Sequence, residues 1–238
     1  MKKWHRKFVL VSGSGNSVFI KTRGVEDLGE AAAVRVGKGV NDAIKCVRDT
    51  IAVLQTDWAN LSQDQQRALR NAAQNFLGTD ERRNLPWGGL TDSQVRTLTA
   101  KLELIMNGLT CGELNIKVGT DKETADRTGK VNAHLFRGVS CRRSWNKSTF
   151  SLEQMFGVPA KVSAKMGDIT LNKDIVDRHG DDDFIVLVIH EAAHKYAGAW
   201  DHQYIQGGLN GAVQDLDTVK CLENADSIGH YCGGVGLS

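Results

Sequence analysis

One stretch of this 238-residue sequence limits the fold of the chain more than any other. Three aspartates at 181–183 precede the apolar run Phe184–Ile189, and the pattern His-Glu-Ala-Ala-His follows at 190–194. Aspartates suit the N-terminus of a helix, and Gly198 suits the end of one. A helix that is apolar on all sides belongs in a protein core. The run has enough β-branched residues for a buried strand, but its flanks favour a buried helix.

The His-Glu-x-x-His pattern on such a helix predicts a metal site. His190 and His194 lie one turn apart on the same face, where both imidazoles can bind one ion. Zinc accepts neutral imidazole nitrogens, and a catalytic zinc keeps a fourth coordination position for water. Glu191 is next to the first histidine, where its carboxylate can take a proton from that water. The alternative is a pair of core histidines satisfied by hydrogen bonds, because buried polar groups need partners.

The residues that follow the motif resemble one family of metal-dependent peptidases. The segment Gly198–Tyr204 is similar to the G-T-x-D-x-x-Y signature of the aspzincin metallopeptidases, the group of deuterolysin and the lysine-specific metallo-endopeptidases. The segment Asn224–Ser227 has the sequence N-A-D-S, which resembles an element of the same family. Ala199 stands where the family usually has threonine, and Ile205 stands where glycine often follows the tyrosine. Neither difference removes a zinc ligand.

The resemblance implies a Zn²⁺ site and a role for each of its residues. It makes His190, His194 and Asp201 the zinc ligands, with the aspartate in place of the third histidine of other zincins. It makes Glu191 the general base and Tyr204 the residue that hydrogen-bonds the developing oxyanion.

Two further polar residues leave alternatives open. His202 directly follows Asp201 and competes with it as the third ligand, because imidazole is chemically the better ligand. Asp226 is a candidate substrate-binding residue, since in lysine-specific relatives an acidic residue selects lysine in the pocket after the scissile bond. It is equally a candidate for a hydrogen bond to a zinc-ligating histidine, with a plain structural cap as the remaining option.

The N-terminal half of the chain has helical patterns. Apolar residues recur at helical spacing from Val40 to Leu54, which predicts a first amphipathic helix. Capping boxes at 62–65 and 91–94 begin two more helices, which we expect to end at Gly78 and at Asn107-Gly108.

The segments outside these helices complete the expected fold. Residues 8–22 have the pattern of a hairpin, and the small-residue-rich stretch 24–39 predicts a loosely packed connection. Strand composition occurs at 114–118, 131–136 and 168–172. By resemblance to zincins, the last of these is the candidate edge strand for pairing with extended substrate, and an ordinary sheet strand is the alternative.

The expected fold class is α+β, a zincin-like metallopeptidase. It comprises a helical N-terminal half, a small twisted sheet, the active-site helix and a C-terminal helix, for which apolar residues recur from Leu216 to Ile228. We expect residues 1–39 to form a hairpin-like segment and linker, and residues 40–238 to form the metallopeptidase domain.

Composition excludes several classes of function. The formal net charge of +2 gives no reason to expect nucleic acid as a partner, and the basic loop at 141–147 is more typical of a solvated surface. No apolar run reaches the length of a membrane span, and Phe8–Val11 is too short for a signal-peptide core. We therefore expect a soluble protein, with any export by a signal-independent route. The five cysteines lack C-x-x-C spacing; buried free thiols are the main expectation, and one or two disulfides the alternative.

These observations lead to one expected activity and two alternatives. The expected activity is that of a zinc-dependent endopeptidase acting on polypeptides, such as a secreted or injected bacterial toxin, which would imply a neutralising (immunity) protein as a partner. The first alternative is a zinc amidase or peptidase acting on peptidoglycan cross-links with the same chemistry. The second is a zinc-containing binding module without turnover.

Overall fold

The structure is a computed structural model of the chain. It describes residues 7–11, 18–23, 30–79, 86–110, 115–119, 148–151, 161–164, 169–172 and 180–237. The predicted strand at 131–136 and the basic loop at 141–147 lie outside these residues.

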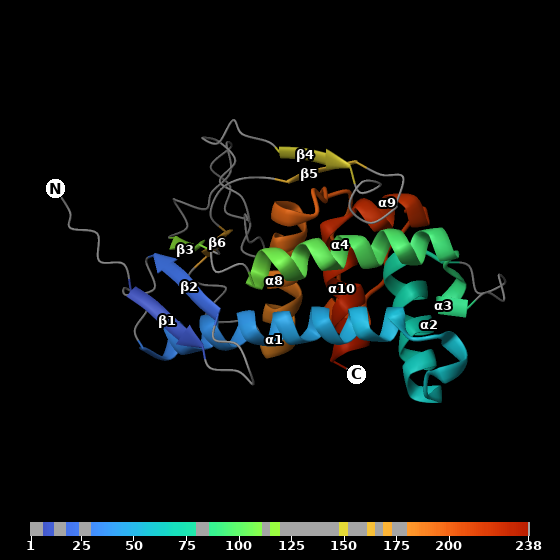
Figure 1. The fold of residues 1–238 in the computed structure, drawn as a ribbon, viewed down its shortest axis with the longest axis horizontal. Helices are drawn as coiled ribbons and strands as arrows, with labels where there is room; N and C mark the ends of the chain where they lie inside the picture. The colour runs from blue at the N-terminus through green and yellow to red at the C-terminus, as the bar shows by residue number, and fades with distance from the viewer. Residues whose placement is uncertain are drawn as a thin grey trace.

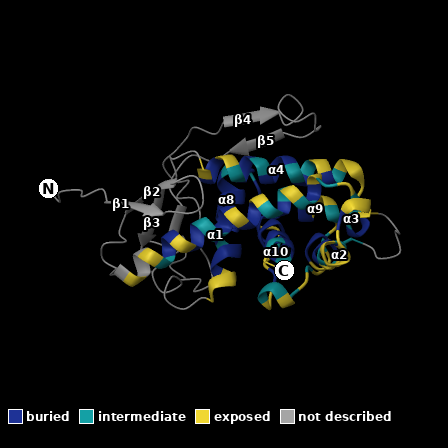
Figure 2. Cartoon of the chain, turned by 60° about the horizontal axis from the view of Figure 1, so that its bottom comes forward, coloured by how far each residue is buried: buried dark blue, intermediate teal, exposed yellow. Residues whose placement is uncertain are grey.

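Most of the described residues are helical, and the buried helix α10 lies among the others. The helices are α1 (Glu30–Gln55), α2 (Gln63–Leu77), α3 (Pro86–Gly89), α4 (Asp92–Thr110), α8 (Asp181–Tyr196), α9 (Thr218–Glu223) and α10 (Ala225–Gly236), with 3-10 turns η2 (Trp58–Asn60) and η3 (Gly208–Asn210). Helix α10 contacts α1, α2, α8 and α9, while α1 and α4 pack side by side across α8 (Figure 1). Figure 2 shows α8 and α10 largely buried and the outer face of α1 exposed.

Short strands accompany the helices. Strand β1 (Lys7–Val11) pairs antiparallel with β2 (Val18–Arg23), which pairs parallel with β3 (Asn115–Gly119). Strand β6 (Ile169–Asn172) is parallel to β3 and stands last in the order β1-β2-β3-β6, whereas β4 (Ser148–Ser151) and β5 (Lys161–Ala164) form a separate antiparallel pair. The helical character of the N-terminal half is confirmed, and the assignment to the α+β zincin-like class stays a prediction.

Both predicted capping boxes are present. The Ser62 side chain accepts a hydrogen bond from the Gln65 backbone N–H at 3.2 Å, and the Gln65 side chain accepts one from the Ser62 N–H at 2.9 Å. Thr91 and Gln94 form the same reciprocal pair at 3.3 and 2.8 Å. These bonds satisfy backbone donors that the first helical turn leaves without partners. Gly78 closes α2 in the left-handed conformation, as expected.

The described part of the stretch 24–39, residues 30–39, is not the loose connection that its small residues suggested. Helix α1 begins at Glu30, and residues 24–29 lie outside the described part of the chain. Val36 and Val40 are fully buried, and a side chain at Gly39 would overlap the Phe184 ring of α8. The small residues therefore allow two helices to approach closely, a use that composition does not separate from that of a linker.

Two helix ends also differ from expectation. Helix α4 continues through Gly108 to Thr110, and Gly108 lies against the Tyr196 ring of α8, where a Cβ would overlap the ring. The predicted C-terminal helix is two helices, α9 and α10, which meet at Asn224 in an extended conformation. Val219, expected on the core face, is 63% exposed.

The apolar run at 184–189 forms the buried helix that its flanks predicted. Phe184, Ile185, Val188 and Ile189 are buried, and the strand alternative is wrong. The three aspartates occupy its first turn, which the helix dipole favours, and Lys38 of α1 donates to Asp181 at 2.7 Å.

Two further expectations concern cysteines and membranes. Cys46, Cys221 and Cys232 are buried free thiols, as expected, while Cys111 and Cys141 lie outside the described residues. Within the described part of the chain, no helix has the length and apolar character needed to cross a membrane.

Helix α10 approaches α8 closely at Gly229. A Cβ built on this glycine would lie 2.8 Å from the Val186 carbonyl oxygen and 3.4 Å from the His190 backbone nitrogen. The absence of a side chain thus lets α10 lie directly against the turn that carries the first histidine of the motif.

We predict that Gly229→Ala destabilises the protein by about 1–3 kcal/mol, because the new methyl group would overlap backbone that cannot rotate away. Gly234→Ala is the matched control on the same helix. Its Cβ would lie 3.1 Å from Phe76 and 3.3 Å from Ala72, where side chains can shift. Denaturant unfolding of both variants measures the difference. An equal or smaller loss at Gly229 would show that the close approach to α8 is not required.

Candidate metal centre

The C-terminal half of α8 buries three polar side chains in the core. His190, Glu191 and His194 are 2%, 0% and 7% exposed, although each can be charged. Burying such groups is unfavourable unless they have partners of suitable chemistry. The residues around them therefore decide what this part of the helix can do.

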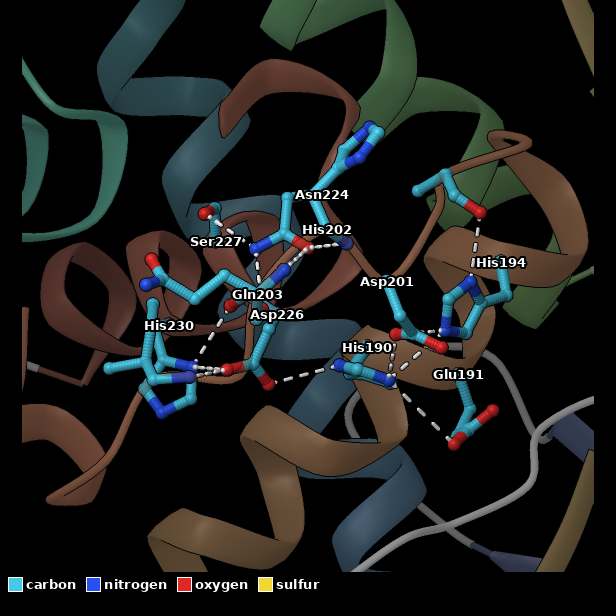
Figure 3. Close-up of polar contacts among 12 residues, drawn as sticks. His190, Glu191, His194, Asp201, His202, Gln203, Asn224, Asp226, Ser227 and His230 are labelled. Carbon is cyan, nitrogen blue, oxygen red and sulfur yellow. Dashed lines mark hydrogen bonds and ion pairs between the residues drawn. The ribbon is translucent and has the colours of Figure 1, made fainter. Parts of the chain in front are cut away.

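The chain turns back after α8 and brings Asp201 to the two histidines. Gly198 takes the left-handed conformation with φ 63°. The Trp200 carbonyl then accepts a hydrogen bond from the Ala225 N–H, which holds the returning chain. Asp201 Oδ1 lies 2.9 Å from His194 Nε2 and 3.4 Å from His190 Nε2. The two histidine Nε2 atoms are 3.1 Å apart (Figure 3).

The hydrogen bonds of the two histidine Nδ1 atoms determine whether the Nε2 atoms have a lone pair for a metal ion. His194 Nδ1 donates to the Ala199 carbonyl oxygen at 2.8 Å, and His190 Nδ1 donates to Asp226 Oδ1 at 3.1 Å. A neutral histidine with a proton on Nδ1 has a lone pair on Nε2. Two such lone pairs therefore face each other beside the Asp201 carboxylate, which is unfavourable without a positive charge between them.

A single metal ion can supply that charge. Zinc bonds of about 2.0–2.2 Å place neighbouring ligand atoms of a tetrahedron about 3.3–3.6 Å apart, within roughly half an ångström of the separations here. The ligand atoms of His190, His194 and Asp201 all lie within 4.8 Å of one another. Two imidazoles and a carboxylate are a donor set that zinc accepts. The cluster can thus hold one metal ion.

The charge of Asp201 is favourable in this environment. Burial raises the pKa of this carboxyl, but in the metal-free protein the hydrogen bond to His194 and the charges that the two histidines carry when protonated outweigh burial and hold the pKa at about 2. A metal ion bound between neutral histidines would supply the positive charge in place of those protons. Asp201 is therefore ionised at neutral pH, as a metal ligand must be.

His202 is not part of this cluster. Its ring lies on the other side of the loop (Figure 3), where Nε2 is 3.9 Å from the Glu223 carboxylate. Of the two candidates for the third ligand, the structure brings only Asp201 to the histidines.

Glu191 and Tyr204 lie beside the cluster. Glu191 Oε1 is 3.9 Å from His190 Nε2, the ring nitrogen that faces the metal position. The Tyr204 ring stacks on His190 with centroids 6.1 Å apart, and its hydroxyl interacts with the Asp201 carboxylate and helps to lower the pKa of Asp201. Burial and the Asp201 charge raise the pKa of Tyr204, so its hydroxyl keeps its proton at neutral pH. The tyrosine is still 40% exposed, which leaves it accessible to a ligand.

Asp226 joins the two parts of the chain that supply the ligands. Its Oδ1 accepts from His190 Nδ1, and its Oδ2 accepts from the Ile205 backbone N–H. Burial raises the pKa of Asp226, but the hydrogen bond and charge of His190 outweigh burial and lower it. Both oxygens face partners within the chain, an arrangement that favours the role of orienting His190 over that of a substrate pocket.

Sequence reasoning missed two groups that support the site. The Ala199 carbonyl, which fixes His194, is a backbone group that no side-chain pattern reveals. His230 is 7% exposed, donates to the Asp226 carbonyl oxygen at 2.9 Å and lies 3.7 Å from its carboxylate. Its spacing of four residues from Asp226 was the available signal, since such residues are neighbours on a helix.

Comparison of the chain with protein-family models, with curated proteins and with solved structures finds no significant match.

We predict that Asp201→Ala lowers the affinity for zinc by more than about 100-fold, because it removes one of three ligands. Loss of a residue that only hydrogen-bonds a ligand typically costs less, about 10–100-fold. His202→Ala is the matched control at the adjacent position and should keep one zinc per chain. Elemental analysis after dialysis, followed by chelator competition, measures both. Zinc retained in the Asp201 variant and lost in the His202 variant would reverse the assignment.

We also predict that Asp226→Asn weakens zinc binding by about 10–100-fold. Both carboxylate oxygens accept from N–H groups, and an amide cannot accept at both positions. Chelator competition with zinc tests this directly. Unchanged zinc affinity together with loss of a preference for Lys or Arg after the cut would instead identify Asp226 as a substrate-pocket residue.

Proposed function

We propose that this protein is a zinc-dependent endopeptidase. The observation that carries the proposal is the convergence of His190, His194 and Asp201 on one point, with the Glu191 carboxylate and the Tyr204 hydroxyl beside it. A buried structural site would have no use for an ionisable carboxylate next to the ligands or for a partly exposed tyrosine at its edge.

Each residue has a task in peptide hydrolysis. A bound zinc ion would supply a Lewis acid and a water molecule whose pKa is near neutrality. Glu191 takes the proton from the attacking water and delivers it to the leaving nitrogen.

Tyr204 acts on the carbonyl oxygen of the scissile bond. Its raised pKa keeps the hydroxyl protonated, so that it donates a hydrogen bond to the negative charge that develops there. The stacking of its ring on His190 restricts the directions in which the hydroxyl can point.

The proposed substrate is a polypeptide in an extended conformation. Strand β6 is last in the strand order of its sheet and has contacts with α8, so its outer edge is available in the described sheet for pairing with a peptide. A delivered toxin with a neutralising partner belongs to the same proposal. Peptidoglycan cross-links are the rival substrate.

The activity itself is tested with zinc-loaded protein on two substrates. A denatured protein should be cut into peptides, whereas purified cell wall should release none. Release from cell wall alone would identify a peptidoglycan hydrolase. Bound zinc without turnover of either substrate would leave only a binding module.

We predict that Glu191→Gln keeps the fold and the zinc but lowers kcat by at least about 10²–10⁴-fold, because glutamine has nearly the same shape and cannot accept the proton. Zinc content and the thermal transition serve as controls beside the rate of peptide cleavage. Turnover near the wild-type rate would refute the mechanism proposed for Glu191.

A further inference from the structure

Asn224 is a fully buried side chain that lies between α9 and α10 and makes four hydrogen bonds (Figure 3). Its Oδ1 accepts from the backbone N–H groups of His202 at 2.9 Å and Gln203 at 3.3 Å. Its Nδ2 donates to the Gln203 carbonyl at 2.9 Å and to Ser227 Oγ at 3.0 Å. A primary amide has two donors and two acceptor lone pairs, so the hydrogen-bonding capacity of Asn224 is fully used.

Three of these four bonds go to the backbone between Asp201 and Tyr204, the two loop residues that reach the metal position. The loop has no helix or sheet ladder there to satisfy its peptide groups. The amide of Asn224 takes the place of a neighbouring strand, since it accepts and donates as a peptide group does.

The residues on both sides of Asn224 fix the ends of the same loop. The Trp200 N–H donates to the Glu223 carbonyl at 2.7 Å, and the Ala225 N–H donates to the Trp200 carbonyl at 2.8 Å. At the other end, the Ile205 N–H donates to Asp226. The segment 223–226 therefore binds the loop before, within and after the stretch that carries the third ligand.

We infer that Asn224 is a positioning residue that holds the loop 201–204 in the conformation in which Asp201 reaches the two histidines. Its four hydrogen bonds go to the loop and to Ser227 and not to His190 or His194, so it acts through the loop, whereas Asp226 also orients His190 directly. The inference rests on the metal site of the proposed function and not on peptide hydrolysis.

A positioning role and a merely structural one predict different effects on zinc binding. If Asn224 acts through Asp201, its loss weakens zinc binding only while Asp201 is a ligand. If it only stabilises the junction of α9 and α10, its loss affects the fold and not the coupling between these two residues. A double-mutant cycle separates the two cases.

The experiment measures the zinc dissociation constant by chelator competition for the wild type, Asn224→Ala, Asp201→Ala and the double variant. We expect Asn224→Ala to raise the constant about 10–100-fold in the wild-type background. In the Asp201→Ala background we expect no further change, because the Nδ1 atoms of His190 and His194 are held by Asp226 and Ala199, which lie outside the loop 201–204.

Two more variants keep the test decisive. Asn224→Asp retains the volume and the two acceptor contacts but loses both donors, so we expect it to weaken zinc binding. This variant provides the test if Asn224→Ala does not fold. Lys101→Met is the matched control, because buried Lys101 donates to the Leu222 carbonyl of α9 at 2.7 Å, a hydrogen bond two residues from Asn224 that does not go to the loop. It should lower the thermal transition of the metal-free protein and leave the zinc constant unchanged.

Three results would overturn the inference. They are an unchanged zinc constant in both Asn224 variants, equal weakening with and without Asp201, or equal weakening by Lys101→Met. A wild-type protein that binds no zinc would overturn it together with the metal site. A protein that binds zinc with the expected couplings but cleaves no peptide would refute only the endopeptidase.

Discussion

The carboxylate of Asp226 connects the parts of the chain on which the site depends. One oxygen accepts from His190 on α8, and the other accepts from Ile205 at the end of the loop that carries Asp201. This contact requires α10 to lie directly against α8, which Gly229 permits because a Cβ at this position would lie only 2.8 Å from the Val186 carbonyl oxygen. The placement of three ligand atoms within one metal's reach thus depends on a helix that supplies none of them.

Two carboxylate charges, Asp226 in the core and the partly exposed Asp201, hold this arrangement, and their contacts affect stability. The pKa of Asp226 is lowered in the folded protein, and that of Asp201 is held at about 2, in both cases because favourable contacts with histidines outweigh burial. A carboxyl whose folded pKa lies below its unfolded value of about 3.9 contributes stability above that value, and the contribution is lost as the pH falls toward the folded pKa. A buried ion pair is weak evidence for high stability, but removing one partner is strongly unfavourable. These contacts therefore specify the geometry of the site more than they strengthen the fold.

Much of the fold was predictable where local patterns and tertiary packing agree. The two capping boxes, the left-handed Gly78 and the apolar faces of α2 and α4 follow from spacing alone, because a helix imposes its period on any sequence that forms it. Prediction failed where small residues serve packing. Gly39 was expected in a linker and Gly108 at the end of a helix, yet they lie against the rings of Phe184 and Tyr196, respectively. Only the partner helix distinguishes the two uses.

The sequence by itself determined the buried helix and the two histidines one turn apart on it, since both depend on spacing within one element. The choice of Asp201 over His202 came from a resemblance, and the structure brings only Asp201 to the histidines. The tertiary structure alone decided how residues 21 to 36 positions apart support one site: Asp226 on His190, and Asn224 and Asp226 on the loop. The physical reason is that side-chain hydrogen bonds depend on distance in space. Periodicity reports only which residues share a face and not which faces meet.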